Sequence, residues 1–149
     1  MKFSRLIAVA FLIVTAIPTA CAQLPAMDPL VDRMAEAIVR SKRKSVIVLD
    51  FSGPGEKYTA LGQAFADKFS MALSKSSDKF SVAARGQLGE ALANNHVPQS
   101  SFTDPLIALW VASESHIQAV ITGKITLSGN ELGISVECHR TDSGRGLEI

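Results

Sequence analysis

Three histidines and two aspartates are the residues of this chain whose types could support catalysis. His96, His116 or His139 could act as a general base, and Asp50 or Asp104 could orient that base. A hydrolase also needs a nucleophile within hydrogen-bond reach of the base. The sequence has no nucleophile elbow, no His-Glu-x-x-His motif and no paired cysteines. We therefore predict no catalytic residue, no metal site and no cofactor, with a small secreted hydrolase as the alternative.

A second candidate site follows the apolar stretch Ser45 to Phe51, where Asp50 precedes Ser52 and Gly53. Partners of open α/β sheets tend to bind at the carboxyl ends of strands, so we expect these three residues to contact a partner protein. The alternative is structural, with Asp50 accepting hydrogen bonds from the backbone N–H of Ser52 or Gly53. A phosphate loop is not expected, because the Gly53 and Gly55 spacing matches no nucleotide-binding motif.

The two cysteines predict different roles. Cys21 follows Pro18, Thr19 and Ala20, close to the pattern that precedes a lipid-modified cysteine in bacterial lipoproteins, except that an aliphatic residue usually stands where Pro18 does. Cys138 lies at alternating positions with Ile134 and Val136 in the sequence, which predicts a small, inward-facing hydrophobic side chain. A reactive thiol at Cys138 is the alternative reading.

The amino terminus predicts export. Lys2 and Arg5 precede an uncharged, mostly apolar run that ends before Pro18, and small residues at 20 to 22 suit a signal peptidase. The run is shorter than the roughly 20 apolar residues of a membrane-spanning helix. We predict a signal peptide over 1–22, cleaved after Ala22, and a periplasmic protein. Lipidation at Cys21, with anchoring to the outer membrane, and an uncleaved signal are the alternatives.

The overall charge of the exported chain predicts no strongly electrostatic partner. Removal of Lys2 and Arg5 with the signal leaves 13 basic against 14 acidic residues, so the exported chain has a formal net charge of −1. One basic cluster remains, which we predict to be a solvated helix end: Arg40, Lys42, Arg43 and Lys44. We expect no nucleic-acid partner, and membrane association only through a lipid anchor or an uncleaved signal.

The elements that must position these residues begin with the β-branched run Val46 to Leu49, which predicts a central strand. Asp28 as an N-cap and Pro29 at the first helical position predict a helix before it. A long helix is expected after it from an apolar stripe at four-residue steps: Leu61, Phe65, Phe69 and Leu73, with Ala64, Met71 and Ala72 beside them. Phe80 to Val82 then predicts a short strand, parallel to the first through a right-handed crossover.

Two further helices are expected next. The first is predicted over Arg85–Asn94, and it should end in a left-handed cap at Asn94 or Asn95. Asp104 and Pro105 repeat the earlier start signal, and four residues follow them at helical steps: Leu106, Leu109, Trp110 and Ser113. We expect the single tryptophan to anchor the core rather than to bind a ligand.

The last third of the sequence alternates between apolar and polar residues. Strands over 119–127 and 132–138, joined by a turn at 128–130, predict an antiparallel hairpin. A turn at 141–144 sends 147–149 into a further strand, so we expect the chain to stop inside its domain. The predicted fold is α/β (α+β): a mixed sheet with a parallel βαβ start around strand 45–51, a C-terminal antiparallel meander, and helices packed on the sheet.

Several short motifs between residues 42 and 149 carry a family resemblance: Lys44 to Phe51, Leu61-Gly62, Phe80-Ser81-Val82 followed by Arg85, Val120 to Gly123, and Ile134-Ser135-Val136 followed by Ser143-Gly144. With them the chain resembles the amino-terminal domain of TolB-like proteins and its relatives in the FlgO and CsgG families. We accordingly divide the chain into a signal (1–22), a leader with the first helix (23–41) and this domain (42–149).

The resemblance implies a noncatalytic cell-envelope domain that binds other envelope proteins. We expect an exported binding module, for instance the amino-terminal part of an envelope assembly factor or of a TonB-like energy transducer.

Overall fold

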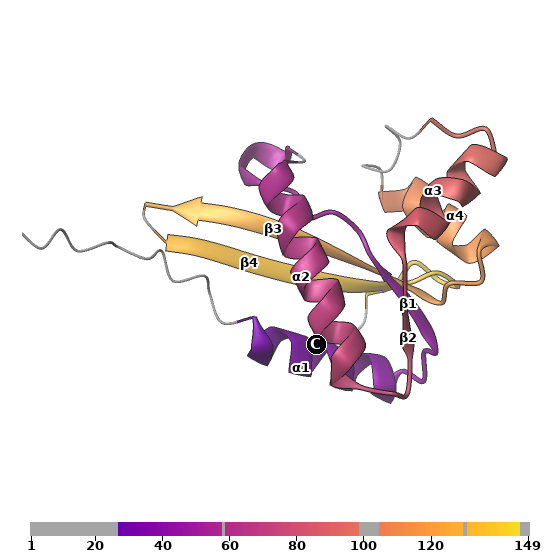
Figure 1. Ribbon diagram of the computed structural model, residues 1–149, viewed down its shortest axis with the longest axis horizontal. Coiled ribbons are helices and arrows are strands. Elements are labelled where there is room, and N and C mark those ends of the chain that lie inside the picture. Colours follow the sequence, from indigo (N-terminus) through magenta and orange to yellow (C-terminus); the bar gives the residue numbers. More distant parts are fainter. Residues whose placement is uncertain (1–26, 58, 99–104, 130, 147–149) are drawn as a thin grey trace, which may run out of the picture.

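The computed structural model describes residues 27–57, 59–98, 105–129 and 131–146. Their centre is a four-stranded mixed sheet in the order β2-β1-β3-β4 (Figure 1). The strands are β1 (Ser45–Val48), β2 (Ser81–Ala83), β3 (Ala119–Ser128) and β4 (Glu131–Arg140). This confirms the predicted fold class.

Helices cover both faces of the sheet. They are α1 (Asp28–Arg40), the 3-10 turn η1 (Pro54–Glu56), α2 (Ala60–Ser76), α3 (Arg85–Asn94) and α4 (Pro105–Glu114). Two separate hydrophobic clusters result, one beneath α1 and α2 and the other beneath α3 and α4. Among the described residues, no helix is both long enough and apolar enough to cross a membrane.

Strand β1 is central because it pairs with a parallel neighbour on each side. Val46 lies opposite Val82 of β2, and Ile47 lies opposite Val120 of β3. The predicted parallel βαβ start is therefore confirmed, although β1 ends at Val48 rather than Phe51. The chain still follows β3 beyond this point, since the N–H of Ser52 donates to the Gly123 carbonyl at 2.8 Å.

Helix α2 crosses directly over the end of this segment at Gly62. A Cβ at that position would overlap the carbonyl oxygen of Phe51 and would lie 2.9 Å from its carbonyl carbon. The close approach lets the rings of Phe51 and Phe69 pack with centroids 5.8 Å apart. The predicted inward stripe is therefore wrong at its first residue, because Gly62 faces the strand and Leu61 is 48% exposed. Ala64 and Met71, which were expected beside the stripe, are exposed as well.

Two helix ends differ from the prediction. Helix α1 begins at Asp28 itself, so that Met27 is the N-cap and Asp28 is not. The carboxylate of Asp28 lies instead in the first turn, where its negative charge interacts favourably with the positive end of the helix dipole and stabilises the helix. After α3, the left-handed residue is His96 with φ of 58°, and Asn95 has φ of −93°.

Helix α4 packs with the face opposite to the predicted one. Ala108, Val111 and Ala112 are buried against β1 and β3, whereas Trp110 is 47% exposed. The expectation that Trp110 anchors the core is wrong. Small alanines face the sheet and allow the helix to approach it closely, which leaves the tryptophan outside.

The hairpin of β3 and β4 matches the prediction, with an unbroken register from Ala119 opposite Arg140 to Ser128 opposite Glu131. Cys138 is buried in the cluster beneath α1 and α2, and this burial raises the pKa of its thiol to about 12. A reactive thiolate at neutral pH is therefore contradicted. The strand predicted at 147–149 lies outside the described residues, as does the predicted signal peptide.

Candidate functional site

The carboxylate of Asp50 is held by an arginine. Arg85, the first residue of α3, donates from Nη1 to Asp50 Oδ1 and from Nη2 to Asp67 Oδ1 on α2. We name these three residues the Arg85 cluster. It lies where β1 and β2 end, and two carboxylates around one guanidinium give it a net charge of −1. The side chains of Asp50 and Asp67 are 41% and 64% exposed, so a partner could reach both.

Burial lowers the pKa of the Arg85 guanidinium from its usual value. An arginine pKa starts so high that the group stays charged at every physiological pH, so its two ion pairs persist. Because the cluster joins β1, α2 and α3, it also fixes how these elements meet at the carboxyl edge of the sheet.

The predicted capping role of Asp50 is wrong. The N–H of Gly53 donates to the carbonyl of Lys57 at 2.6 Å, and the N–H of Ser52 is taken by the sheet. Asp50 therefore pairs with Arg85, which is distant in sequence, and the loop after Asp50 is closed by the backbone hydrogen bond from Gly53 to Lys57.

The three histidines lie on different elements and contact different residues. His96 follows α3, with Nδ1 3.4 Å from the carbonyl of Ala93, and His116 follows α4 with an exposed side chain. His139 Nε2 on β4 lies 3.2 Å from the carboxylate of Glu137. Asp104 lies outside the described residues, within which no group of three or more histidine, cysteine or acidic residues could hold a metal ion.

A groove of about 700 Å³ lies between α1 and the end of α2, and none of the three histidines lines it. It is lined mainly by charged and hydroxyl side chains: Asp32, Glu36, Arg40, Asp78 and Lys79, with Ala35, Val39, Ser76 and Ser77. Within the described part of the chain, the hydrolase alternative thus gains no geometric support.

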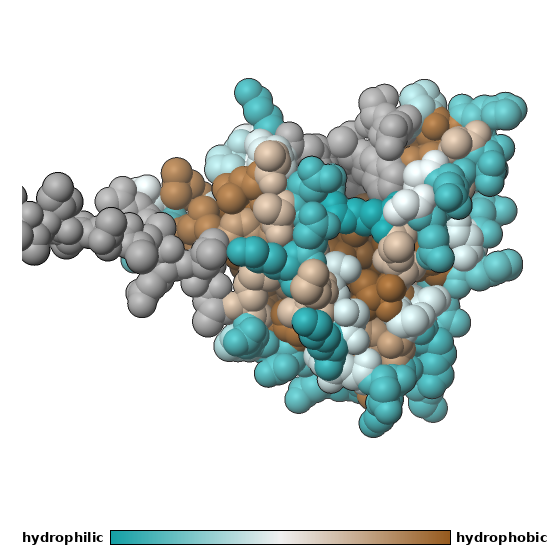
Figure 2. All heavy atoms as spheres, viewed as in Figure 1, coloured by the Kyte–Doolittle hydropathy of each residue, from teal (hydrophilic) through white to brown (hydrophobic). Residues whose placement is uncertain are grey.

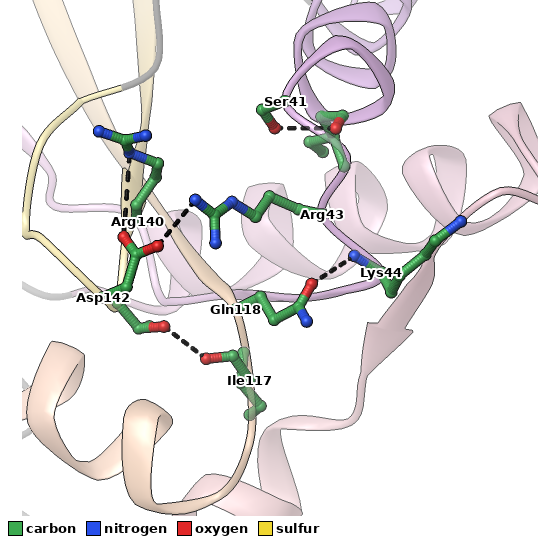
Figure 3. A network of polar contacts seen from close by, with 9 residues as sticks. Ser41, Arg43, Lys44, Ile117, Gln118, Arg140 and Asp142 are labelled. Carbon is green, nitrogen blue, oxygen red and sulfur yellow. Dashed lines mark hydrogen bonds and ion pairs between the residues drawn. The ribbon is translucent and has the colours of Figure 1, made fainter.

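The basic cluster before β1 is not simply a solvated helix end. Arg43 Nη2 donates to Asp142 Oδ2 at 2.9 Å, and the Arg43 side chain is only 18% exposed (Figure 3). Arg140 approaches the other oxygen of Asp142 at 4.0 Å. Hydrogen bonds from Arg43 and Ser143 lower the pKa of Asp142.

Further hydrogen bonds strengthen this connection between the α1–β1 turn and the turn after β4. The backbone N–H of Lys44 donates to Gln118 Oε1 at 2.7 Å, and Thr141 Oγ1 donates to the carbonyl of Ile117 at 2.8 Å. The Arg43 side chain and the Lys44 backbone thus have a structural role here.

The surface feature that sequence reasoning missed is the outer side of α4. Leu106 is 75% exposed and Trp110, one helical turn later, is 47% exposed. Residues four apart lie on the same side of a helix, so the two side chains form one apolar face. The signal was present in the sequence, because α4 contains a single charged residue and is apolar around its circumference.

Comparison with known proteins gives a fold but no sequence family. No protein-family model matches the chain, and no curated protein sequence is significantly similar to it. Three solved structures of LpoB share its fold. The C-terminal domain from Escherichia coli has a TM-score of 0.68 and 17% identity, with 80% of this chain and 88% of that chain covered. The domain from Salmonella enterica has a TM-score of 0.65 and 16% identity, with 82% and 90% covered.

The NMR structure of E. coli LpoB has a TM-score of 0.60 and 15% identity, with 99% of this chain and 79% of that chain covered. These likenesses correct the predicted membership of the TolB, FlgO and CsgG group, which is wrong. The motifs behind that prediction were short pieces of strands, one helix start and a turn, and such features recur in any mixed sheet that begins with a βαβ unit and ends in a hairpin.

Proposed function

We propose that this protein is exported to the periplasm and is a noncatalytic domain that binds other cell-envelope proteins. The observation that carries the proposal is the apolar face of α4 formed by Leu106 and Trp110. Exposed apolar area costs about 25 cal/mol per Å² relative to burial, and tryptophan is among the commonest hot-spot residues of protein interfaces. The likeness to LpoB in fold supports the same reading.

Two further parts of the proposal concern attachment and the second site. Lipidation at Cys21 would anchor the domain to the outer membrane, whereas cleavage after Ala22 would release it. The exposed carboxylates of the Arg85 cluster would contact basic groups of a partner, next to the half-buried Ser52 and the buried Gly53, which follow Asp50 in the sequence. The narrower roles of an envelope assembly factor or a TonB-like energy transducer gain no support from the comparisons.

A photo-cross-linking amino acid tests the binding role in cells that express the full chain. Placed at position 110, it should attach the domain to another envelope protein. Placed at Glu90, an exposed residue of α3, it should not. Absence of any product at position 110 would reject the α4 face. Recovery of the protein from the cytosol with residues 1–22 intact would reject export.

A further inference from the structure

Strand β4 is the last of the described strands in the sheet, and its outer edge is long. No other described strand pairs with it between Glu131 and Cys138; beyond these residues, His139 pairs with Gly146. The opposite edge, β2, has only three residues. Figure 1 shows the hairpin extending well past the helices, and in Figure 2 hydrophobic residues gather on this part of the surface. An open edge of this kind is a template for a further strand.

The hydrogen bonds after β4 show which backbone groups point outward. The N–H of Arg140 donates to the carbonyl of Arg145, away from β3, while the N–H of Thr141 donates to Gln118 on the β3 side. In an antiparallel ladder this direction alternates from one residue to the next. The N–H and C=O groups of Leu132, Ile134 and Val136 therefore point outward.

The two faces of this edge have different chemistry. Leu132 and Ile134 are half-buried and pack against the cluster beneath α1 and α2, so an apolar side chain on an added strand would extend that core. On the other face, Glu131 and Glu137 are exposed, and the Glu137 side chain is 73% exposed. An added strand would place its own alternate side chains beside these carboxylates.

Three of the usual protections of an edge strand are missing from β4 between Glu131 and Cys138. It has no proline and no lysine, and its continuous pairing with β3 leaves no bulge. A second copy of the same strand would be disfavoured in the antiparallel register centred on Ile134, because that register sets Glu131 opposite Glu137.

We propose that the edge of β4 from Glu131 to Val136 pairs with an extended segment of an envelope protein, in which apolar residues alternate with lysine or arginine. This inference rests on the proposed binding function and names the chemistry of one partner segment. Backbone hydrogen bonds supply affinity in such strand addition, and the alternating side chains supply specificity.

A fluorescent peptide, Lys-Val-Lys-Val-Lys-Val-Lys, tests the edge directly by anisotropy with the purified full-length protein. It should bind, and N-methylation of alternate peptide nitrogens should weaken binding about tenfold or more, because the charge is kept while the outward hydrogen bonds are lost. The acidic counterpart, with glutamate for lysine, should not bind. Equal binding of the methylated peptide, or no binding of either basic peptide, would overturn the proposal.

Ile134→Pro is the matched variant. Its ring removes an outward N–H that β3 does not use, so an edge strand tolerates it and the peptide should bind about tenfold more weakly. Trp110→Ala should leave peptide binding unchanged. If Ile134→Pro does not fold, the methylated peptide still decides the question.

Cross-linking from Ser135, whose side chain lies on the exposed face, separates this inference from the proposed function. A product with an envelope protein at Ser135 supports the inference. A product at Trp110 alone would overturn the β4 edge and leave the binding function standing, and no product at either position would overturn both. A cross-link to a second copy, or within the same chain, would also reject the partner segment.

Discussion

The close contact of α2 with the end of the central strand predicts that Gly62→Ala destabilises the fold. The added Cβ would meet the backbone of Phe51, which is held by the sheet and cannot rotate away as a side chain could. Overpacking of this kind costs about 1–3 kcal/mol, and a backbone clash belongs near the upper limit. Alanine gains about 1 kcal/mol in helix propensity over glycine. We therefore expect a net loss of about 2 kcal/mol.

Equilibrium urea denaturation measures this change, with Gly89→Ala as the control. Gly89 also lies within a helix, but a Cβ there meets nothing within 4 Å, so the same substitution should stabilise by up to about 1 kcal/mol. Opposite signs for the two variants, at unchanged m-values, would establish the contact. If Gly62→Ala were as stabilising as Gly89→Ala, the packing of α2 on Phe51 would be refuted.

Three further outcomes are expected. Because burial raises the pKa of Cys138 to about 12, its thiol should resist iodoacetamide at pH 8 in the folded protein and react in urea, as read by peptide mass mapping. The hydrogen bond from Arg43 lowers the pKa of Asp142, so their pairing should stabilise the fold above the unfolded pKa of about 3.9 and lose this effect as the pH falls toward the lower folded value. Asp142→Asn should remove that part of the pH dependence in thermal melts. Trp110→Ala should change the free energy of unfolding by less than about 0.5 kcal/mol and should reduce recovery of the envelope partner in co-purification. A large loss of stability would show that Trp110 is part of the core.

Elements with a strong local pattern were predicted well from the sequence. The alternation of apolar and polar residues before and after 128–130 predicted the hairpin correctly, because side-chain direction along a strand repeats every two residues. Arg85–Asn94 was predicted with both ends correct. Each of these patterns depends on residues only a few positions apart, and a single sequence contains that information in full.

The partners of the charged residues were not predicted, because they are distant along the chain. Arg43 and Asp142 are separated by 99 positions, and Asp50 and Arg85 by 35. One rule could have found the second pair. Asp50 and Arg85 each follow a strand of the predicted parallel βαβ unit, and adjacent parallel strands end at the same edge of a sheet. No comparable rule relates the α1–β1 turn to the turn after β4.

The orientation of α4 was wrong for a reason that bears on function. A helix that is apolar around its whole circumference gives no indication of which side faces the core, and such helices are usually buried. Here Ala108, Val111 and Ala112 are buried against the sheet, with Ile107 and Leu109 half-buried beside them. The large side chains of Leu106 and Trp110 are exposed. Leu106 and Trp110 thus leave apolar area in contact with water that burial would remove. The outward apolar face therefore fits a helix that has a second surface to cover it, and an envelope partner is the surface we propose.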